Sequence, residues 1–292
     1  IDTVGRLTGT GGTINFGSAG LLTVTNSSDS TFAGNFSGTP GFNSAYFVKQ
    51  GAGALTLSGT SSVQGAGRFE IVDGRLIVQG GNAIGDRSIV GMAGGTFELQ
   101  ANETIGALAT VSSAINLNSF TLTIGGLGGG VNASSGDVIS GTGGVHYNAA
   151  GLVSTFSGQS TFTGTLRVSA GTVRLGANDR FAAASSLLVD GGVFDTAGFS
   201  NTFSSVTVSA GRIAGLGTIT SNSDFDVRSG TIAAVLAGSV GLNKTTSGTV
   251  TLSGANTYTG ETTISAGTLQ IESANALGSS AAGTTVRDGA SL

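Results

Sequence analysis

A glycine that is followed two residues later by an apolar side chain recurs about every 20 residues along much of this chain. In the second half the marker falls, at steps of 18 to 21 residues, on Gly171, Gly192, Gly211, Gly230, Gly248 and Gly267. Between these glycines lie segments such as TVRL, SVTVS and TLQIE, whose alternation of apolar and polar residues is typical of a strand with one solvated face. A unit of this length cannot bury its apolar side chains alone, but it can bury them against stacked copies of itself. The glycine period therefore predicts a solenoid.

The predicted fold class is all-β: a right-handed parallel β-helix that forms a single solenoid over residues 1–292. At roughly 20 residues per coil the chain would make about 14 coils, paired in parallel at about 4.8 Å. The right-handed winding follows from the crossover rule for parallel strands. The alternative, an antiparallel sandwich or barrel, usually shows hairpin turns about 8–12 residues apart. The side chains expected to point inward are Leu55, Leu57, Phe97, Leu99, Leu122, Ile124, Val206, Val208, Val250, Leu252, Leu269 and Ile271.

The composition excludes several classes of function. Only 10% of the residues are charged and the net charge is −4, which argues against a basic nucleic-acid footprint. The absence of cysteine removes disulfides and thiolate sites, and the single histidine, His146, removes a multi-histidine metal site. The longest uninterrupted apolar stretch, residues 232–237, is far shorter than the about 20 residues of a membrane helix. We therefore expect no cofactor, no metal, no nucleic-acid partner and no membrane insertion by this segment.

Two groups of polar residues are candidates for catalysis, and each also has a structural interpretation. A serine-hydrolase site would need His146, but no nucleophile motif accompanies it, so an outward-facing histidine on a strand is preferred. Asp224 and Asp226 lie two apart in a strand-like run and could form the carboxylate pair of a polysaccharide-degrading β-helix enzyme. A solvated pair that flanks Phe225 is the preferred interpretation.

Three further segments invite other interpretations. Asp190 and Asp195 bracket a Gly-Gly pair and are predicted to be turn residues. The run GGLGGG at residues 125–130 misses the spacing of a phosphate-binding loop and precedes no helix, so a flexible corner or longer loop is preferred. Residues 30–47 form an aromatic-rich stretch that either packs in the core or makes a loop excursion that covers the rod or binds a ligand. It contains Phe32, Phe36, Phe42, Tyr46, Phe47 and the single proline, Pro40.

Three longer copies of one pattern lie within this period, at residues 48–99, 145–195 and 242–292. The copies align on GALTLSGTSSVQG, LVSTFSGQSTFTG and GTVTLSGANTYTG, and each continues through a strand-like run to a small residue, a glycine and an asparagine further on. The residues that carry the pattern, all expected to be structural, are Lys49, Gly53, Leu55, Leu57, Gly59, Gly65 and Gly74, then Gly158, Phe162, Gly164 and Gly171, and then Lys244, Gly248, Leu252, Gly254, Tyr258, Gly260, Thr262, Gly267 and Leu269.

The third copy, from Asn243 to Ser280, resembles the passenger-associated transport repeat, also called the autotransporter-associated β-strand repeat. That pattern runs through lysine, glycine, Leu-x-Leu-x-Gly, an aromatic residue, glycine, threonine, Ala-Gly-Thr-Leu and Asn-Ala-Leu-Gly. The first copy departs from it by two extra residues before Gly74, and the second lacks the lysine and has phenylalanine in place of the usual leucine and tyrosine.

The resemblance implies a passenger domain of a Gram-negative bacterium, exported across the outer membrane to the cell surface ahead of a C-terminal outer-membrane barrel. The repeat is thought to assist secretion and folding, so we expect a non-enzymatic adhesin or stalk whose partner is an unidentified host or cell-surface receptor or glycan. The alternatives are an extracellular filament or sheath subunit that self-associates through its coil ends and, less favoured, the polysaccharide-degrading enzyme. Because Ile1 opens the chain and Met92 is its single methionine, we also expect a processed or excised piece.

Overall fold

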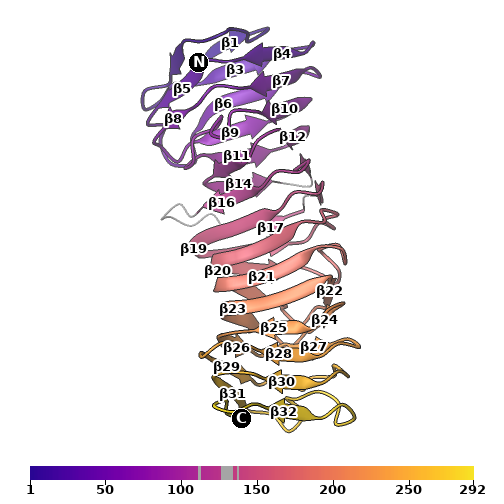
Figure 1. Cartoon of the computed structure of the whole chain (residues 1–292). Coiled ribbons are helices and arrows are strands. Elements are labelled where there is room, and N and C mark those ends of the chain that lie inside the picture. The colour runs from indigo at the N-terminus through magenta and orange to yellow at the C-terminus, as the bar shows by residue number, and fades with distance from the viewer. Residues whose placement is uncertain (111–112, 126–133, 137) are drawn as a thin grey trace.

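The chain forms a straight stack of strands with its two ends at opposite poles (Figure 1). The structure, a computed structural model, describes residues 1–110, 113–125, 134–136 and 138–292. All regular structure in this part of the chain is strand, and every strand pair within it is parallel. The predicted parallel β-solenoid is confirmed, with about 13 turns spaced about 21 residues apart in place of the expected 14 coils of 20.

Each coil contributes to three faces, and the register of the strands and corner hydrogen bonds follow each face along the rod. The first face consists of β1 (Asp2–Val4), β3 (Leu22–Thr25), β6 (Ala45–Gln50), β9 (Arg68–Ile71), β11 (Ile89–Met92), β14 (Ala107–Thr110), β17 (Ser134–Ser135), the second halves of β19 (Val145–Phe156), β20 (Thr165–Leu175), β21 (Ser186–Asp195) and β23 (Ser205–Ala214), and then β26 (Gly230–Ile232), β29 (Thr249–Leu252) and β31 (Thr268–Ile271).

The second face is made by β4 (Ser30–Phe32), β7 (Ala54–Leu57), β10 (Arg75–Val78), β12 (Thr96–Leu99), β15 (Ala114–Asn116), β18 (Val138–Ser140), β22 (Asn201–Phe203), β24 (Thr218–Ser221) and β27 (Val235–Ala237). The third face is made by β2 (Thr13–Asn15), β5 (Asn35–Gly38), β8 (Ser62–Val63), β13 (Glu103–Ile105), β16 (Leu122–Gly125), the first halves of β19, β20, β21 and β23, and then β25 (Phe225–Val227), β28 (Leu242–Lys244), β30 (Thr262–Ile264) and β32 (Thr284–Val286).

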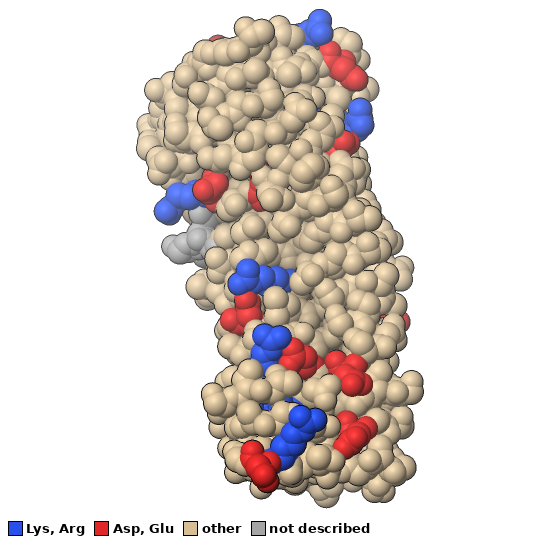
Figure 2. All heavy atoms as spheres, viewed as in Figure 1, with Lys and Arg blue, Asp and Glu red and all other residues tan. Residues whose placement is uncertain are grey.

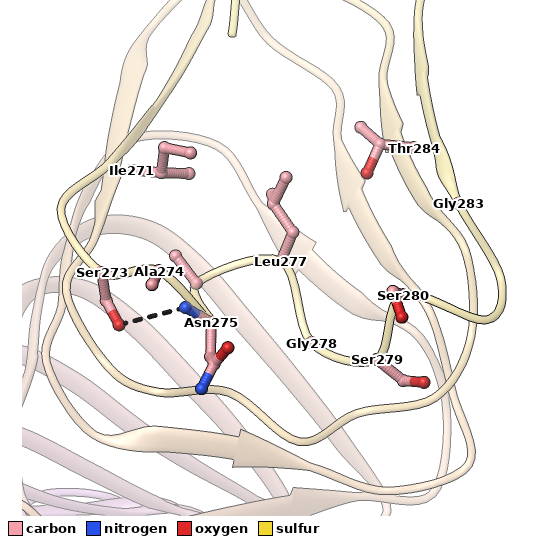
Figure 3. Close-up of a pocket in the computed structure, with 11 residues that line it drawn as sticks. Ile271, Ser273, Ala274, Asn275, Leu277, Gly278, Ser279, Ser280, Gly283 and Thr284 are labelled. Carbon is pink, nitrogen blue, oxygen red and sulfur yellow. Dashed lines mark hydrogen bonds between the residues drawn. The ribbon is translucent and has the colours of Figure 1, made fainter.

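The core is a column of apolar side chains that runs the length of the rod, because the inward position of each strand lies over that of its neighbour. Leu166, Leu187 and Val206 are one such column, joined by the register of β20, β21 and β23. Burying one such side chain stabilises the fold by about 1.5–3 kcal/mol. Of the predicted inward side chains, all are at most 3% exposed except Ile271, which is 43% exposed. Ile271 lies on the last strand of its face, beside the cavity of Figure 3, so no later strand covers it.

The aromatic-rich stretch is not the loop excursion that residues 30–47 could have formed. It contains three strands, β4, β5 and β6, and Phe32, Phe36, Tyr46 and Phe47 are all buried. Only residues 33–34 and 39–44 lie outside strands, and Phe42, in the longer of these two connections, is 54% exposed. The aromatic rings pack on one another across coils, so the stretch belongs to the core.

The outer surface carries few charges, and Figure 2 shows blue and red side chains adjoining in several places. Arg167 pairs with Asp190 and Arg174 with Asp195, each across one coil at 2.5 and 2.8 Å. The prediction that both aspartates are turn residues was wrong, because both lie in β21 and face arginines of β20. The described residues contain no helix with the length and apolar character that a membrane crossing requires.

Candidate functional site

The side chains of the repeat pattern form the interior of each coil. The apolar and polar members are all at most 2% exposed, namely Lys49, Leu55, Leu57, Phe162, Lys244, Leu252, Tyr258, Thr262 and Leu269. The glycines lie at corners, either between strands or at the bend of a long strand, namely Gly53, Gly59, Gly65, Gly74, Gly158, Gly164, Gly171, Gly248, Gly254, Gly260 and Gly267. The repeat pattern therefore specifies the interior side chains and the corner glycines of a coil.

Two physical requirements explain the corner glycines. At Gly59 a Cβ atom would lie 2.0 Å from the carbonyl oxygen of Gly34 in the previous coil, so a side chain would force the coils apart. At Gly267 the φ angle is +70°, in the left-handed region that glycine adopts without a steric penalty. The corners thus need glycine for close stacking at some positions and for backbone conformation at others.

Lys49 lies near the end of β6 and points into the rod. Its side chain is 0% exposed, and its Nζ donates hydrogen bonds to the carbonyl oxygens of Gln50 at 3.1 Å, Gly51 at 2.7 Å and Asp73 at 3.1 Å. Gln50 and Gly51 begin the corner that follows β6, whereas Asp73 belongs to the equivalent corner one coil later. The ammonium group therefore ties two successive corners together, and we call this arrangement the lysine cap.

Lys244 forms the same cap in the third copy. Its side chain is 0% exposed, and its Nζ donates to the carbonyl oxygens of Thr246 in the adjoining corner and of Ala266, at 2.9 Å, one coil later. Asp73 and Ala266 both precede the corner glycine of the next coil, so the two caps correspond residue by residue. Sequence reasoning found both lysines but not their role.

Burial dominates the electrostatics of the caps. Loss of water around the ammonium group lowers the pKa of both Lys49 and Lys244 from the usual lysine value. For Lys49 the carboxylates of Asp73 and Asp29 oppose this effect. Both ammonium groups donate to backbone carbonyl oxygens, so each cap holds the corners of two successive coils together.

The first copy starts on a different face from the third. Lys49 and β6 lie on the first face and Leu55 in β7 on the second, whereas Lys244 in β28 lies on the third face and β29 on the first. The second copy agrees with the third, because its Ser154–Phe156 segment also lies on the first face. Paired residues on the first face are 18 to 25 residues apart in the sequence between β3 and β14, so the coils differ in length. The repeat pattern therefore does not start on the same face in every copy.

His146 lies on β19 and faces outward, as the preferred interpretation predicted. Its Nε2 is 2.6 Å from Ser169 Oγ, in the neighbouring strand. Burial and then Arg167 lower the pKa of His146, and Asp190 opposes them. In the part of the chain that the structure describes, the carboxylate beside this pair, Asp190, is bonded to Arg167, so the pair lacks the third member of a hydrolase triad.

The aspartates that could have formed a glycosidase pair have other partners. Asp224 accepts hydrogen bonds from the Gly241 amide at 2.7 Å and from Asn243 at 3.2 Å. Asp226 forms an ion pair with Arg228 at 2.7 Å. The side chain between them, Phe225, is 0% exposed, so Asp226 lies on the outer side of β25 and Asp224, which precedes the strand, also points outward. No group of three or more potential metal ligands occurs among the described residues, and the GGLGGG run lies outside them except for Gly125.

A three-sided parallel solenoid with a recurrent, buried corner motif defines a β-helical repeat protein. The passenger-associated-transport-repeat family matches the chain at residues 47–78, 155–175 and 242–271. The chain is 34% identical over 158 residues to the adhesin BmaC autotransporter of Brucella suis biovar 1 (strain 1330), which covers 54% of this chain and 4% of the relative. No solved structure matches the chain.

The three matched ranges show that this chain carries passenger-associated transport repeats, and together with the likeness to an autotransporter adhesin they support its interpretation as an autotransporter passenger segment. Domains of this kind are exported across the outer membrane to the cell surface, which is the location of this segment. Each matched range overlaps one of the three predicted copies and is shorter than it.

Proposed function

We propose that this segment is a non-catalytic stalk that displays an adhesive surface, and that its coils assist export by folding one upon another outside the cell. The observation that carries the proposal is the lysine cap. Each cap bonds a corner of one coil to the same corner of the next, so a completed coil presents carbonyl acceptors and strand edges that order the following one. Coils that have folded outside the cell in this sequential way cannot move back across the outer membrane.

The adhesive part of the proposal is supported by the printed name of the relative, an adhesin, and by the outward side chains of the solenoid, which are mainly polar. The chain spans 4% of that relative, so the receptor or glycan and the C-terminal outer-membrane barrel of the longer protein are inferences from the likeness. Weak contacts repeated along a stiff rod would add up to useful avidity.

An in-register deletion tests the stalk and adhesin roles separately. Removing residues 166–186 brings Leu187 to the position of Leu166, with which it is paired, and so deletes one coil while preserving the stack. We expect a cell-surface fusion of this variant to be exported normally and to keep its adhesion to epithelial monolayers and glycan arrays. A matched deletion of residues 187–205, which aligns Val206 with Leu187, is the control. Failure of the undeleted chain to bind any surface would contradict the adhesive role.

The export role has its own test. Lys49→Met together with Lys244→Met removes both caps, and we expect slower appearance of the fusion at the cell surface in a pulse–chase measurement with protease accessibility. A control that changes the exposed Arg212 to Met should be exported at the normal rate. Equal rates for all three proteins would contradict the export role and leave the stalk role standing.

A second candidate is end-to-end assembly into a filament. At the C-terminal end a cavity of about 410 Å³ opens between the last corners, with Ile271, Leu277 and Thr284 around it (Figure 3). Sedimentation over a concentration series would show growing assemblies if this candidate is right, and a constant monomer would contradict it.

The catalytic alternative has less support, because Asp224 and Asp226 already have partners. Release of reducing sugars from uronic-acid polymers that is lost in Asp224→Ala would establish it.

A further inference from the structure

A hollow of about 450 Å³ lies on the outer side of the solenoid, at the corner between the second and third faces. Its lining comes from three successive coils, within residues 119–121, 142–146 and 164–167. Pockets that bind small molecules usually have volumes of about 300–1,000 Å³. The hollow is therefore large enough to hold one small ligand against the side of the rod.

Glycine residues create the hollow. The strand register places five residues in one column along this corner, namely Thr121, Gly144, Thr165, Ser186 and Ser205. Gly144 is the member of this column without a side chain, and the adjoining corner residues Gly143 and Gly164 are also glycines. A Cβ atom at Gly164 would lie 2.2 Å from the Gly143 carbonyl oxygen, so these corners are in direct backbone contact. The floor of the hollow is thus bare backbone.

Four hydroxyl groups surround this floor, those of Ser119, Thr121, Thr142 and Thr165. Thr142 donates a hydrogen bond to the Asn118 carbonyl oxygen at 3.1 Å, and Thr165 Oγ1 lies 2.9 Å from Ser186 Oγ. A hydroxyl group can donate one hydrogen bond and accept two, so both threonines keep capacity for a ligand. Within the described part of the chain, the hydroxyls of Ser119 and Thr121 have no protein partner.

The ionisable groups beside these hydroxyls are paired or neutral. Arg167, at one end of the hollow, directs Nε and Nη2 to the same carboxylate oxygen of Asp190, at 2.7 and 2.5 Å. His146 Nε2 lies 2.6 Å from Ser169 Oγ. Burial and then Arg167 lower the pKa of His146, so its imidazole is neutral at neutral pH. The hollow therefore offers hydrogen-bonding groups without an uncompensated charge.

We propose that this hollow binds one neutral hexose unit of a surface glycan, held by the hydroxyl groups of Ser119, Thr121, Thr142 and Thr165. A hexose presents several hydroxyl groups that donate and accept in different directions, as these four side chains do. A neutral sugar fits because Asp190 already occupies the guanidinium group that would otherwise attract a carboxylate or sulfate. This site rests on the adhesive role proposed above and specifies the class of glycan recognised there.

Binding at one hollow is expected to be weak. Among the described residues that line it there is no aromatic ring on which a sugar could stack, and the hydroxyl groups exchange water for sugar with little net gain. We therefore expect a dissociation constant on the order of 1 mM. Many copies of the passenger on one cell would bind a glycan-coated surface together, and avidity would make the attachment firm.

A sugar titration of the whole chain tests the proposal. The probes are the methyl glycosides of glucose, galactose, mannose and N-acetylglucosamine, and the readout is the amide resonances of Gly144 and Gly164. We expect at least one probe to shift both resonances and to saturate at millimolar concentration. Glucuronate, which carries a carboxylate, should bind about tenfold more weakly than that probe. Constant resonances with all four neutral sugars, or glucuronate binding as tight as theirs, would overturn the proposal.

A matched pair of variants locates the binding. Thr121→Val, Thr165→Val removes two of the hydroxyl groups and keeps the side-chain shape, and we expect about tenfold weaker sugar binding. Thr207→Val, Thr263→Val changes two outward threonines of the same face away from the hollow and should leave binding unchanged. If the first variant does not fold, Ser119→Ala, Thr142→Ala removes the other two hydroxyl groups, both from exposed residues. Full affinity in the variants of the hollow would overturn the proposal.

Cell adhesion separates this site from the adhesive role itself. A fusion that adheres while the sugars leave both resonances unchanged would overturn the sugar site and leave the adhesive role standing. Shifted resonances in a chain whose fusion does not adhere would contradict the adhesive role and leave the sugar site standing. Both coil deletions described above, of residues 166–186 and 187–205, keep all four hydroxyl residues, so each should still bind the sugar that the undeleted chain binds.

Discussion

Tyr258 Oη and Thr262 Oγ1 lie 2.6 Å apart inside the rod, and both side chains are 0% exposed. The corresponding residues of the second copy are Phe162 and Leu166, which are also 0% exposed. The two hydroxyl groups are thus present together in one copy and absent together in the other. This pairing is expected, because a buried hydroxyl that loses its partner costs free energy whereas an apolar pair of similar shape does not.

Tyr258→Phe should therefore lower the free energy of unfolding by about 1–3 kcal/mol, since it leaves the Thr262 hydroxyl buried without its partner. The double variant Tyr258→Phe, Thr262→Val should recover part of this loss by copying the apolar pair of the second copy. Urea unfolding of both single variants and the double variant gives the interaction energy in a double-mutant cycle. Strictly additive losses would mean that the hydroxyls do not act as a pair.

Lys244→Met should destabilise the rod by about 1–3 kcal/mol, because the Thr246 and Ala266 carbonyl oxygens lose a charged donor in a buried corner. Methionine has a similar length and fills the space, so the loss reports on the hydrogen bonds. Arg212→Met removes an exposed cation from β23 and should change stability by less than about 0.5 kcal/mol. The cap would have no stabilising role if the two variants unfolded at the same urea concentration.

The sequence predicts the solenoid because its period is a direct consequence of geometry. A corner needs glycine at places such as Gly59, where a neighbouring backbone comes too close for a side chain, and most strands between corners bury alternate residues. The inward leucines and valines could be named for the same reason. The small error in coil number arises because the register spacing varies from coil to coil.

The lysine caps and the burial of Glu103 were not predictable in this way. Lysine and glutamate are ordinarily exposed, and only the three-dimensional approach of two corners supplies the partners that make their burial tolerable. The aromatic stretch was ambiguous because its rings fit either a core or a loop until the coils are stacked. The different starting face of the first copy could not be predicted, because it depends on the lengths of the individual coils and not on the repeat motif. A recurrent polar-Thr-apolar triplet at Glu103, Asn201 and Asn256 was the available signal for the buried acceptors.

Two glycine variants separate backbone strain from steric exclusion. Gly151 has a φ angle of +76° with open space around it, whereas Gly171 has +74° and an added Cβ would lie 2.1 Å from the Ala149 carbonyl oxygen. Gly151→Ala should cost about 1–2 kcal/mol from the left-handed conformation alone. Gly171→Ala should cost clearly more, because the coils must also move apart. Thermal unfolding of the two variants measures the difference, and equal losses would contradict the close-stacking explanation.

The aromatic stretch offers a matched pair of its own. The rings of Phe47 and Phe69 are stacked with centroids 4.2 Å apart, and Phe69 is 0% exposed. Phe69→Ala should therefore lower the free energy of unfolding by about 3–5 kcal/mol. Phe42→Ala, at the exposed tip of residues 39–44, should change it by less than about 0.5 kcal/mol. A large loss for Phe42→Ala would show that this tip packs on the rod after all.

His146 should make the rod sensitive to acid. Because burial and Arg167 lower its pKa below the usual value of 6.5, the unfolded chain takes up a proton on His146 at a pH where the folded chain does not. Stability that is present above about pH 6.5 is therefore lost as the pH falls below that value. His146→Gln should retain more of its stability than the wild type when the pH is lowered from 7.5 to 5, as measured by urea unfolding. The burial assignment for His146 would be wrong if acidification destabilised the two proteins equally.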